Sequence, residues 1–212
     1  SFNYSYIIDN AKSDKPKPKE ESIFRTLLDG VQINNGQFVL NNYTRKAQPE
    51  SAHGMDYDRL HFKDLNLRAS YLQFIGPRLS ADINHLSFQE SSGFGIDTFR
   101  ADVTFHDQTL DFQNLLLQTP RSRISDQVTM NFEDRSALGN NFLDGVDLIT
   151  QFDSSTISLQ DLSYFSSDVA RVDKRLHFSG AVRGKVGNFQ SEDFRLAFGE
   201  QSFFEGAISF NG

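Results

Sequence analysis

Strict alternation of apolar and polar residues dominates the middle of this chain. The stretch FRADVTFHDQTLDF, residues 99–112, places an apolar residue at every second position on both sides of Asp107-Gln108. A period of two is that of a β-strand, whose successive side chains point to opposite faces. A two-residue turn at Asp107-Gln108 would bring the apolar positions of both strands onto one face. The four positions nearest to the turn are Val103, Phe105, Leu110 and Phe112.

Similar strand patterns run before and after this hairpin. We expect strands around 60–67, 70–75 and 79–88, with Gly76-Pro77 separating the last two. After Phe112 the alternation is interrupted at Asn114 and resumes shifted by one residue, which predicts a β-bulge. Alternating stretches continue to the end of the chain, so the sequence predicts an all-β protein.

Residues 1–57 form a less regular N-terminal part. Residues 2–8 alternate and predict a strand, whereas the Lys- and Pro-rich residues 11–22 predict a mobile, solvated loop. Asn35-Gly36 lies between alternating residues, and this dipeptide is a strong signal for a two-residue hairpin turn. We therefore expect a hairpin with Val31, Ile33, Phe38 and Leu40 on one face.

One stretch has helical spacing instead. In SLQDLSYFSSDVA, apolar residues recur every three or four positions, and Ser158 is placed to cap a helix, with Asp161 three residues later. We expect a short helix near 159–166 that covers an end or an edge of the sheet. The remaining residues 58–212 are expected to form a repeated β-sheet segment.

The sequence contains no recognisable motif for catalysis, cofactor binding or metal binding. The 212 residues carry a net charge of −7, include 21 Phe, and contain no Cys, which excludes disulfides and thiolate sites. We predict no catalytic residue, no cofactor and no metal site. We also predict no nucleic-acid partner, because the chain has no surplus of basic residues. None of the five histidines has a second His at helical metal spacing, and we assign none of them as a metal ligand or a general base: His53, His61, His85, His106 and His177.

Four stretches resemble the TamB/AsmA-like family of envelope proteins, the translocation and assembly module family, in the form found in Bacteroidota. They are SGFGIDTFRADVTF at 92–105, NLLLQTPRS at 114–122, DLSYF at 161–165 and FEGAISFNG at 204–212. The resemblance covers about residues 58–212, and its signatures are strand patterns and not catalytic motifs. Because the chain begins at Ser1 and ends just after a strand pattern, we expect an internal fragment of a longer protein.

The resemblance implies an all-β fold with one short helix, in which an elongated antiparallel sheet is partly rolled into a half-pipe, or β-taco, with an apolar concave face. It implies a bridge-like periplasmic protein that carries phospholipid acyl chains along a hydrophobic groove between the inner and outer membranes and supports outer-membrane biogenesis. The expected partners are phospholipid, an Omp85-type outer-membrane barrel protein, and the inner membrane through an anchor that no apolar run here supplies.

The alternation of apolar and polar residues is also compatible with other folds and functions. The same apolar residues could fill the closed core of a β-sandwich that serves as a binding or adhesion module. The protein could also be an assembly factor for outer-membrane proteins or a glycan hydrolase with paired carboxylates. Under the groove hypothesis, the lining residues are Val103, Phe105, Leu110, Phe112, Leu79, Ala81, Ile83, Leu196, Phe198, Ile208 and Phe210.

Overall fold

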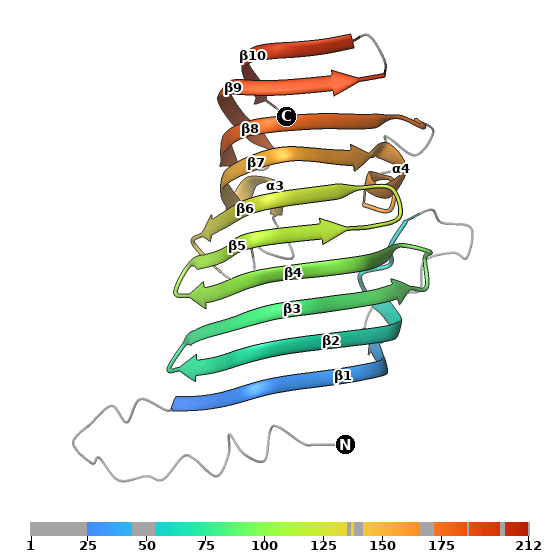
Figure 1. Ribbon diagram of the computed structural model, residues 1–212, viewed down its shortest axis with the longest axis vertical. Helices are drawn as coiled ribbons and strands as arrows, with labels where there is room; N and C mark the ends of the chain where they lie inside the picture. Colours follow the sequence, from blue (N-terminus) through green and yellow to red (C-terminus); the bar gives the residue numbers. More distant parts are fainter. Residues whose placement is uncertain are drawn as a thin grey trace, which may run out of the picture.

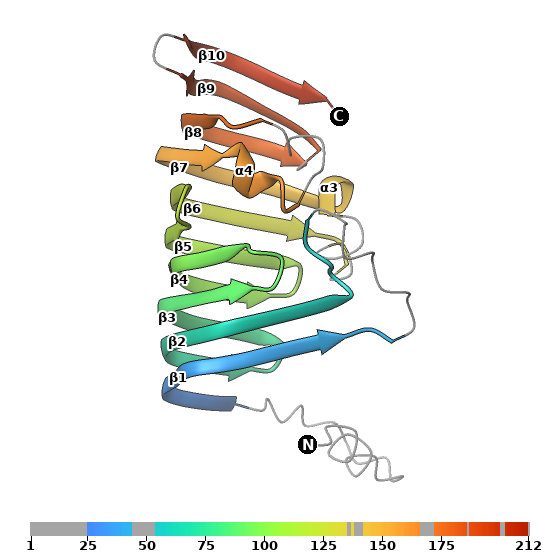
Figure 2. The same ribbon diagram turned by 90° about the vertical axis from the view of Figure 1, so that its right-hand side faces the viewer.

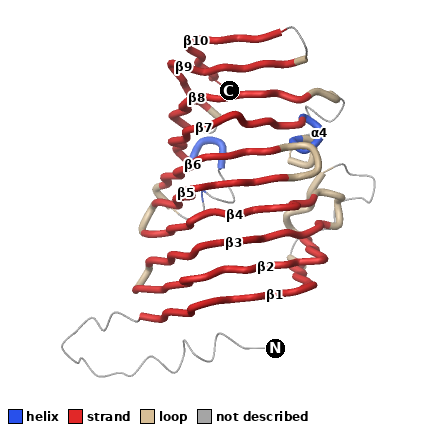
Figure 3. The backbone as a smooth tube through the Cα atoms, in the orientation of Figure 1, coloured by secondary structure: helices blue, strands red, loops and turns tan. Residues whose placement is uncertain are grey.

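The computed structural model shows one antiparallel sheet of ten strands, stacked in sequence order from β1 to β10 (Figure 1). Figure 3 shows how strand dominates the described residues, with helix confined to short pieces. The structure describes residues 25–43, 54–134, 137, 142–165, 172–185, 187–199 and 202–211. The expected strand at 2–8 and the loop at 11–22 lie outside these residues.

The described residues form ten strands and two helices of one turn each. The strands are β1 (Arg25–Asn41), β2 (Arg59–Ile75), β3 (Arg78–Glu90), β4 (Gly95–His106), β5 (Thr109–Gln118), β6 (Arg123–Phe132), β7 (Val146–Ser158), β8 (Arg175–Lys185), β9 (Asn188–Phe198) and β10 (Ser202–Asn211). The helices are α3 (Phe142–Gly145), which precedes β7, and α4 (Leu159–Leu162), which follows it.

The sheet is rolled but stays open. Each strand makes its extensive contacts with its neighbours in the sheet, and β1 and β10 lie at opposite ends of the long axis (Figure 1). Turned by 90°, the strands appear bent into two limbs (Figure 2). The predicted all-β fold, with a partly rolled antiparallel sheet, is therefore confirmed.

Register shifts explain how the strands bend. Every one of the nine ladders contains at least one such shift. In β3 and β5 the apolar residues that flank the shift are three positions apart instead of two, Ile83 to Leu86 and Phe112 to Leu115. An extra residue bends a strand and reverses its alternation. Both limbs can therefore present their apolar residues to the same side.

Polar side chains occupy the bulges. The Asn114 amide donates to Asp102 Oδ2 at 2.6 Å, and Asn114 has a φ of 52°, which Asn tolerates better than most residues. In β9 the Asp193 carboxylate accepts from the backbone N–H of Ala181 at 3.3 Å. The bulge predicted at Asn114 is thus confirmed, and its side chain helps to hold the bend.

Small residues line the inside of the bend in the first strands. Ala69, Ala81 and Ala101 are 5%, 6% and 3% exposed, and Ala81 and Ala101 lie near register shifts between neighbouring strands. Larger side chains would crowd one another where the sheet is most curved. The buried side chains at the bend of these first strands are therefore small.

The hairpin at Asp107-Gln108 forms as the sequence predicted. Phe105 lies opposite Leu110, and Val103 lies opposite Phe112. Directly opposed residues of antiparallel strands share a face. The four apolar side chains therefore lie on one face of the sheet.

The hairpin predicted at Asn35-Gly36 is wrong. Both residues lie inside β1, which pairs with β2 along its length, so Ile33 lies opposite Leu67 and Phe38 opposite Phe62. Asn35 adopts a φ of 49° and marks a shift in register. The positive φ that the sequence signalled is used to kink a continuous strand. The two strands expected at 60–67 and 70–75 are likewise one strand, β2.

The predicted helix is present but short. α4 spans Leu159–Leu162, and the Ser158 hydroxyl caps it by accepting from the Gln160 N–H. Asp161 does not serve as the second member of the expected capping box. Its carboxylate instead accepts from Thr119 and Ser122, about 40 residues earlier in the chain.

Replacement of Gly180 tests the backbone of the bend. Gly180 has a φ of +123°, and an added Cβ would lie 2.7 Å from the Asp193 carbonyl oxygen. We expect Gly180→Ala to lower the free energy of unfolding by about 2–3 kcal/mol in urea titrations. The control is Gly30→Ala, whose Cβ would meet its nearest atom at 3.7 Å, and which should not destabilise the protein. Equal effects at both sites would contradict this account of the bend.

Candidate functional site

Two apolar rows cross the middle of the sheet on its concave side, which we call the inner face. Each row steps from strand to strand through directly opposed residues, from β3 to β6. The first row is Leu79, Phe105, Leu110 and Met130, and the second is Ala81, Val103, Phe112 and Val128.

The opposite face carries polar residues at the adjacent positions. The neighbouring row is Ser80, Thr104, Asp111 and Thr129. Asp111 accepts from the Thr129 hydroxyl at 2.5 Å and from the Gln113 amide at 3.0 Å, so this face satisfies its own polar groups. The two faces of the central strands are therefore chemically distinct.

Rows of aromatic rings continue the inner face on both limbs. Phe62 lies 5.8 Å from Phe38 and 4.7 Å from Phe88 between ring centroids, and Phe88 lies 6.4 Å from Phe94. Further along the sheet, Phe178 lies 5.0 Å from Phe152 and 6.1 Å from Phe194. The aromatic side chains therefore form two groups, one from β1 to the β3–β4 turn and one from β7 to β9.

Most of the predicted lining residues are neither fully buried nor fully exposed. Ala81 is 6% exposed and Phe198 is 45% exposed, while the side chain of Phe210 is not among those described. The others are half-buried, a state that suits either an open groove or a loosely covered core: Leu79, Ile83, Val103, Phe105, Leu110, Phe112, Leu196 and Ile208.

Two of the C-terminal candidates, Leu196 and Phe198, lie opposite apolar residues of the neighbouring strands. Leu196 lies opposite Phe178 and Phe204, and Phe198 lies opposite Leu176. Ile208 lies opposite Ser191, and Phe210 lies opposite Phe189. These residues are placed along β9 and β10, several strands away from the central rows.

A small buried cluster packs against the inner face near the end of β6 and the start of β7. Phe132, Ala137 and Val146 form a buried cluster there, and Val146 is fully enclosed, with 0% exposure. Phe105 and Leu110 pack against this cluster. At this rim the predicted lining residues therefore contribute to a small core as well as to the face.

A second segment covers the opposite rim. Residues 159–165, which we call the strap, comprise α4 and the residues that follow it. Phe94, in the β3–β4 turn, lies 5.7 Å from Tyr164 and 5.0 Å from Phe165 between ring centroids. The backbone carbonyl of Tyr164 also accepts from the Met55 N–H at 2.9 Å. The strap thus reaches from β7 to turns that belong to the first strands.

A buried carboxylate anchors the strap. Asp161 is 5% exposed and accepts from Thr119 Oγ1 at 2.6 Å and from Ser122 Oγ at 2.5 Å. The Arg121 guanidinium lies 3.4 Å away and supplies the opposite charge. Ser122 Oγ in turn accepts from the Ser158 N–H at 2.9 Å. The β5–β6 turn and the strap are therefore joined by one connected network, which we call the latch.

Glu90 holds the turn that presents Phe94 to the strap. Its carboxylate accepts from the backbone N–H of Ser92 at 2.6 Å and of His61 at 3.1 Å. Burial of Glu90 acts to raise its pKa, but the hydrogen bonds to Ser92, His61 and Ser91 outweigh burial and hold the pKa below its usual value. Glu90 is therefore best stabilised as a carboxylate.

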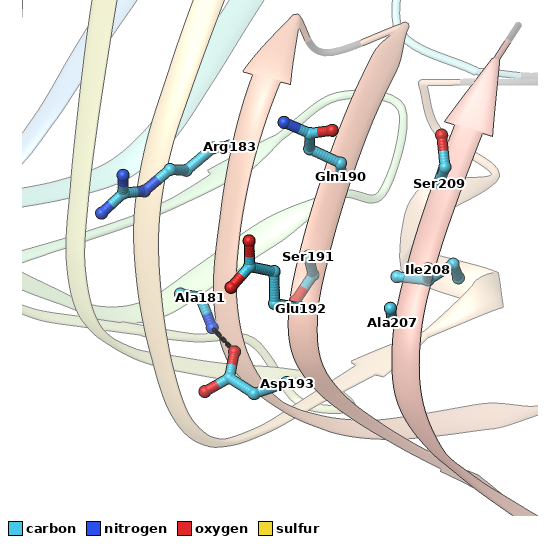
Figure 4. Close-up of a pocket in the computed structure, with 9 residues that line it drawn as sticks. All are labelled: Ala181, Arg183, Gln190, Ser191, Glu192, Asp193, Ala207, Ile208 and Ser209. Atoms are coloured by element: carbon cyan, nitrogen blue, oxygen red, sulfur yellow. Dashed lines mark hydrogen bonds between the residues drawn. The ribbon is translucent and has the colours of Figure 1, made fainter.

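A cavity of about 680 Å³ lies at the bend of the last three strands (Figure 4). Most of its lining residues are polar, and Figure 4 shows Glu192 and Asp193 on β9 facing Ala181 on β8. Of the predicted lining residues, Ile208 alone borders it. This cavity is not the apolar groove expected from the sequence.

Among the described residues, no three His, Asp or Glu side chains are grouped so that they could hold a metal ion. In the same part of the chain, no helix has the length and apolar character that crossing a bilayer would require. No protein-family model matches the chain, and neither a curated protein nor a solved structure does.

The sequence did not reveal the latch. Thr119, Arg121 and Ser122 belong to a loop between strands, and Asp161 was assigned to a helix cap. The only sequence feature that pointed to the latch was the carboxylate of Asp161 in a short amphipathic stretch. Its partners depend on how β5, β6 and β7 pair in the sheet.

The lowered pKa of Glu90 predicts a pH-dependent contribution to stability. This stabilisation is fully present above the unfolded value of about 4.5, and it is lost as the pH falls through the lower folded value. We expect Glu90→Gln to reduce the free energy of unfolding by about 1 kcal/mol at pH 7 and by less at pH 3. Urea titrations at both pH values check this. A loss of the same size at both would contradict the assigned role.

Proposed function

We propose that this chain is part of a bridge-like lipid carrier and that phospholipid acyl chains lie along its inner face. The observation that carries the proposal is the contrast between the faces. Val103 and Phe112 oppose each other on the inner face, and one residue along, Thr104 and Asp111 oppose each other on the outer face. An apolar surface without a specific polar anchor suits a ligand that must slide.

The energetics favour such a ligand. Burial of one methylene stabilises by about 0.8 kcal/mol, so a tail of about sixteen carbons costs roughly 12 kcal/mol when left in water. Half-buried apolar residues on the inner face, such as Phe105 and Leu110, could contact such a tail without unfolding the sheet. A carrier needs this surface to be continuous.

The length of the sheet is also compatible with binding of acyl chains. Ten strands are separated by nine steps, and a step of about 4.8 Å gives an inner face roughly 43 Å long before twist is considered. Acyl chains of one membrane leaflet span about 15 Å. The inner face is thus long enough to hold acyl chains in succession.

We further propose a periplasmic location, within a protein anchored in the inner membrane, and phospholipid and an Omp85-type outer-membrane barrel as partners. The resemblance of residues 58–212 to the TamB/AsmA-like family supports these steps. In this proposal the protein supports outer-membrane biogenesis and is not an enzyme.

A role in assembling outer-membrane proteins is the second candidate. β1 is an edge strand in which Leu27, Leu28, Phe38 and Val39 are 52%, 43%, 48% and 53% exposed. An apolar strand edge can template another strand. All ten described strands belong to one sheet, which supports an open face over a closed β-sandwich module.

Charged residues on the inner face should abolish lipid binding. We expect the variant Val103→Glu with Phe112→Lys to carry at least about tenfold less co-purified phospholipid, because acyl chains cannot solvate charges. Organic extraction and mass spectrometry of the purified chain measure this. The matched control is Thr104→Glu with Asp111→Lys, an opposed pair one residue along on the outer face, which should retain lipid.

Circular dichroism would establish that both variants fold. If the inner-face variant does not fold, a photoreactive phospholipid can be crosslinked to the unaltered chain. Adducts should then map to inner-face residues and not to Thr104 or Asp111. Equal lipid loss in both variants, or adducts on both faces, would contradict the proposal.

A further inference from the structure

The outer face of the last strands carries a highly exposed aromatic residue. Phe203 on β10 is 78% exposed, more than any other phenylalanine among the described residues. Its neighbour Phe204 lies opposite Leu196, which lies opposite Phe178 of the inner-face aromatic group. Because successive side chains of a strand point to opposite faces, Phe203 lies on the outer face. A single exposed ring is ordinary on a protein surface, so its surroundings decide whether it marks a site.

Phe203 ends a row of opposed residues that crosses four strands. Ala197 on β9 lies opposite Phe203 and also opposite His177 on β8, and His177 lies opposite Thr156 on β7. Directly opposed residues of antiparallel strands share a face. The row therefore places one methyl group between a phenyl ring and an imidazole ring.

The small side chain of Ala197 leaves a slot between these two rings. Neighbouring strands lie about 4.8 Å apart, so the backbones of β8 and β10 are separated by roughly 10 Å. Carbon atoms pack best at about 3.5–4.0 Å, so a six-membered ring with a contact on each of its faces needs about 7–8 Å. A cavity of about 260 Å³ is present at this place, and His177, Ala197 and Phe203 are among its lining residues.

A hydrogen bond orients one wall of the slot. Thr156 Oγ1 lies 2.8 Å from His177 Nδ1, and this contact restricts rotation of the imidazole. A side chain that is already ordered loses less conformational entropy when a ligand binds. The His177 wall is therefore partly organised before any ligand arrives.

A neutral ion pair supplies hydrogen-bonding groups beside the slot. The Arg195 guanidinium donates to Glu205 Oε1 at 3.0 Å, and both residues line the same cavity. Their side chains are 67% and 58% exposed, so a ligand in the cavity can reach both the N–H donors and the carboxylate. The two charges cancel within the pair, so the pair selects neither a phosphate nor a polyamine.

We propose that the slot formed by His177, Ala197 and Phe203 binds a neutral sugar ring of a glycan. A sugar ring has a face of C–H groups, which the electron-rich face of Phe203 attracts. It also has a rim of hydroxyl groups, which donate to Glu205 and accept from Arg195. The site lies on the outer face and does not rest on the proposed lipid function.

Saturation-transfer NMR with the purified chain tests the site. The probes are trisaccharides of N-acetylglucosamine, glucose and galactose, and titration gives the Kd of each one that binds. We expect at least one trisaccharide to bind and Phe203→Ala to weaken its binding about tenfold, because the ring platform is lost. Ala197→Leu fills the slot and should abolish binding.

Two matched controls separate the slot from general surface effects. Tyr71→Ala removes a ring that is 64% exposed on β2, and Ala207→Leu enlarges a residue of β10 that does not line this cavity. Neither change should alter the Kd. Equal weakening by Phe203→Ala and Tyr71→Ala would overturn the site, and so would failure of all three trisaccharides to bind.

The tripeptide Gly-Tyr-Gly distinguishes a sugar from an aromatic side chain of a partner protein. If the tripeptide binds in a manner that Phe203→Ala abolishes, and the trisaccharides do not bind, the slot belongs to a protein interface and the sugar proposal is wrong. Co-purified phospholipid should be the same in Phe203→Ala, Ala197→Leu and the unaltered chain. The outcome for this site is therefore independent of the outcome for the proposed function.

Discussion

The backbone ladder between neighbouring strands, with a register shift inside every ladder, is the constraint on which this structure depends. The apolar residues that flank the shifts are three positions apart at Ile83–Leu86 and Phe112–Leu115, so unbroken alternation would turn the apolar residues of one limb outwards. The extra residue at each shift prevents this. Curvature and the identity of the inner face are thus produced by the same feature.

A sheet built in this way has a large face and a small core. Residues near the bend are small, as Ala69 and Ala101 are, and the fully enclosed side chains lie where a connecting segment covers a rim, as at Val146. Ala137 and Val146 at one rim and the strap at the other therefore each cover part of the apolar surface.

Much of the central sheet could be predicted from sequence. The Asp107-Gln108 hairpin and the bulge at Asn114 were both predicted, because turn chemistry and alternation agreed over a few adjacent residues. Asn35-Gly36 was misread for a physical reason. Its positive φ is equally suited to a turn or to a kink in a continuous strand, and the choice was made by pairing with β2. Local conformation was predictable there, but connectivity was not.

The sequence by itself determined which residues share a face, since a period of two is a property of the extended chain and needs no partner. It also determined that strands would dominate and that Ser158 would cap a helix. Only the tertiary structure decided where that helix is fastened. Asp161 finds Thr119 and Ser122 because β5, β6 and β7 stack in order and bring their ends together at one rim. A contact between residues about 40 positions apart leaves no periodic trace in the chain.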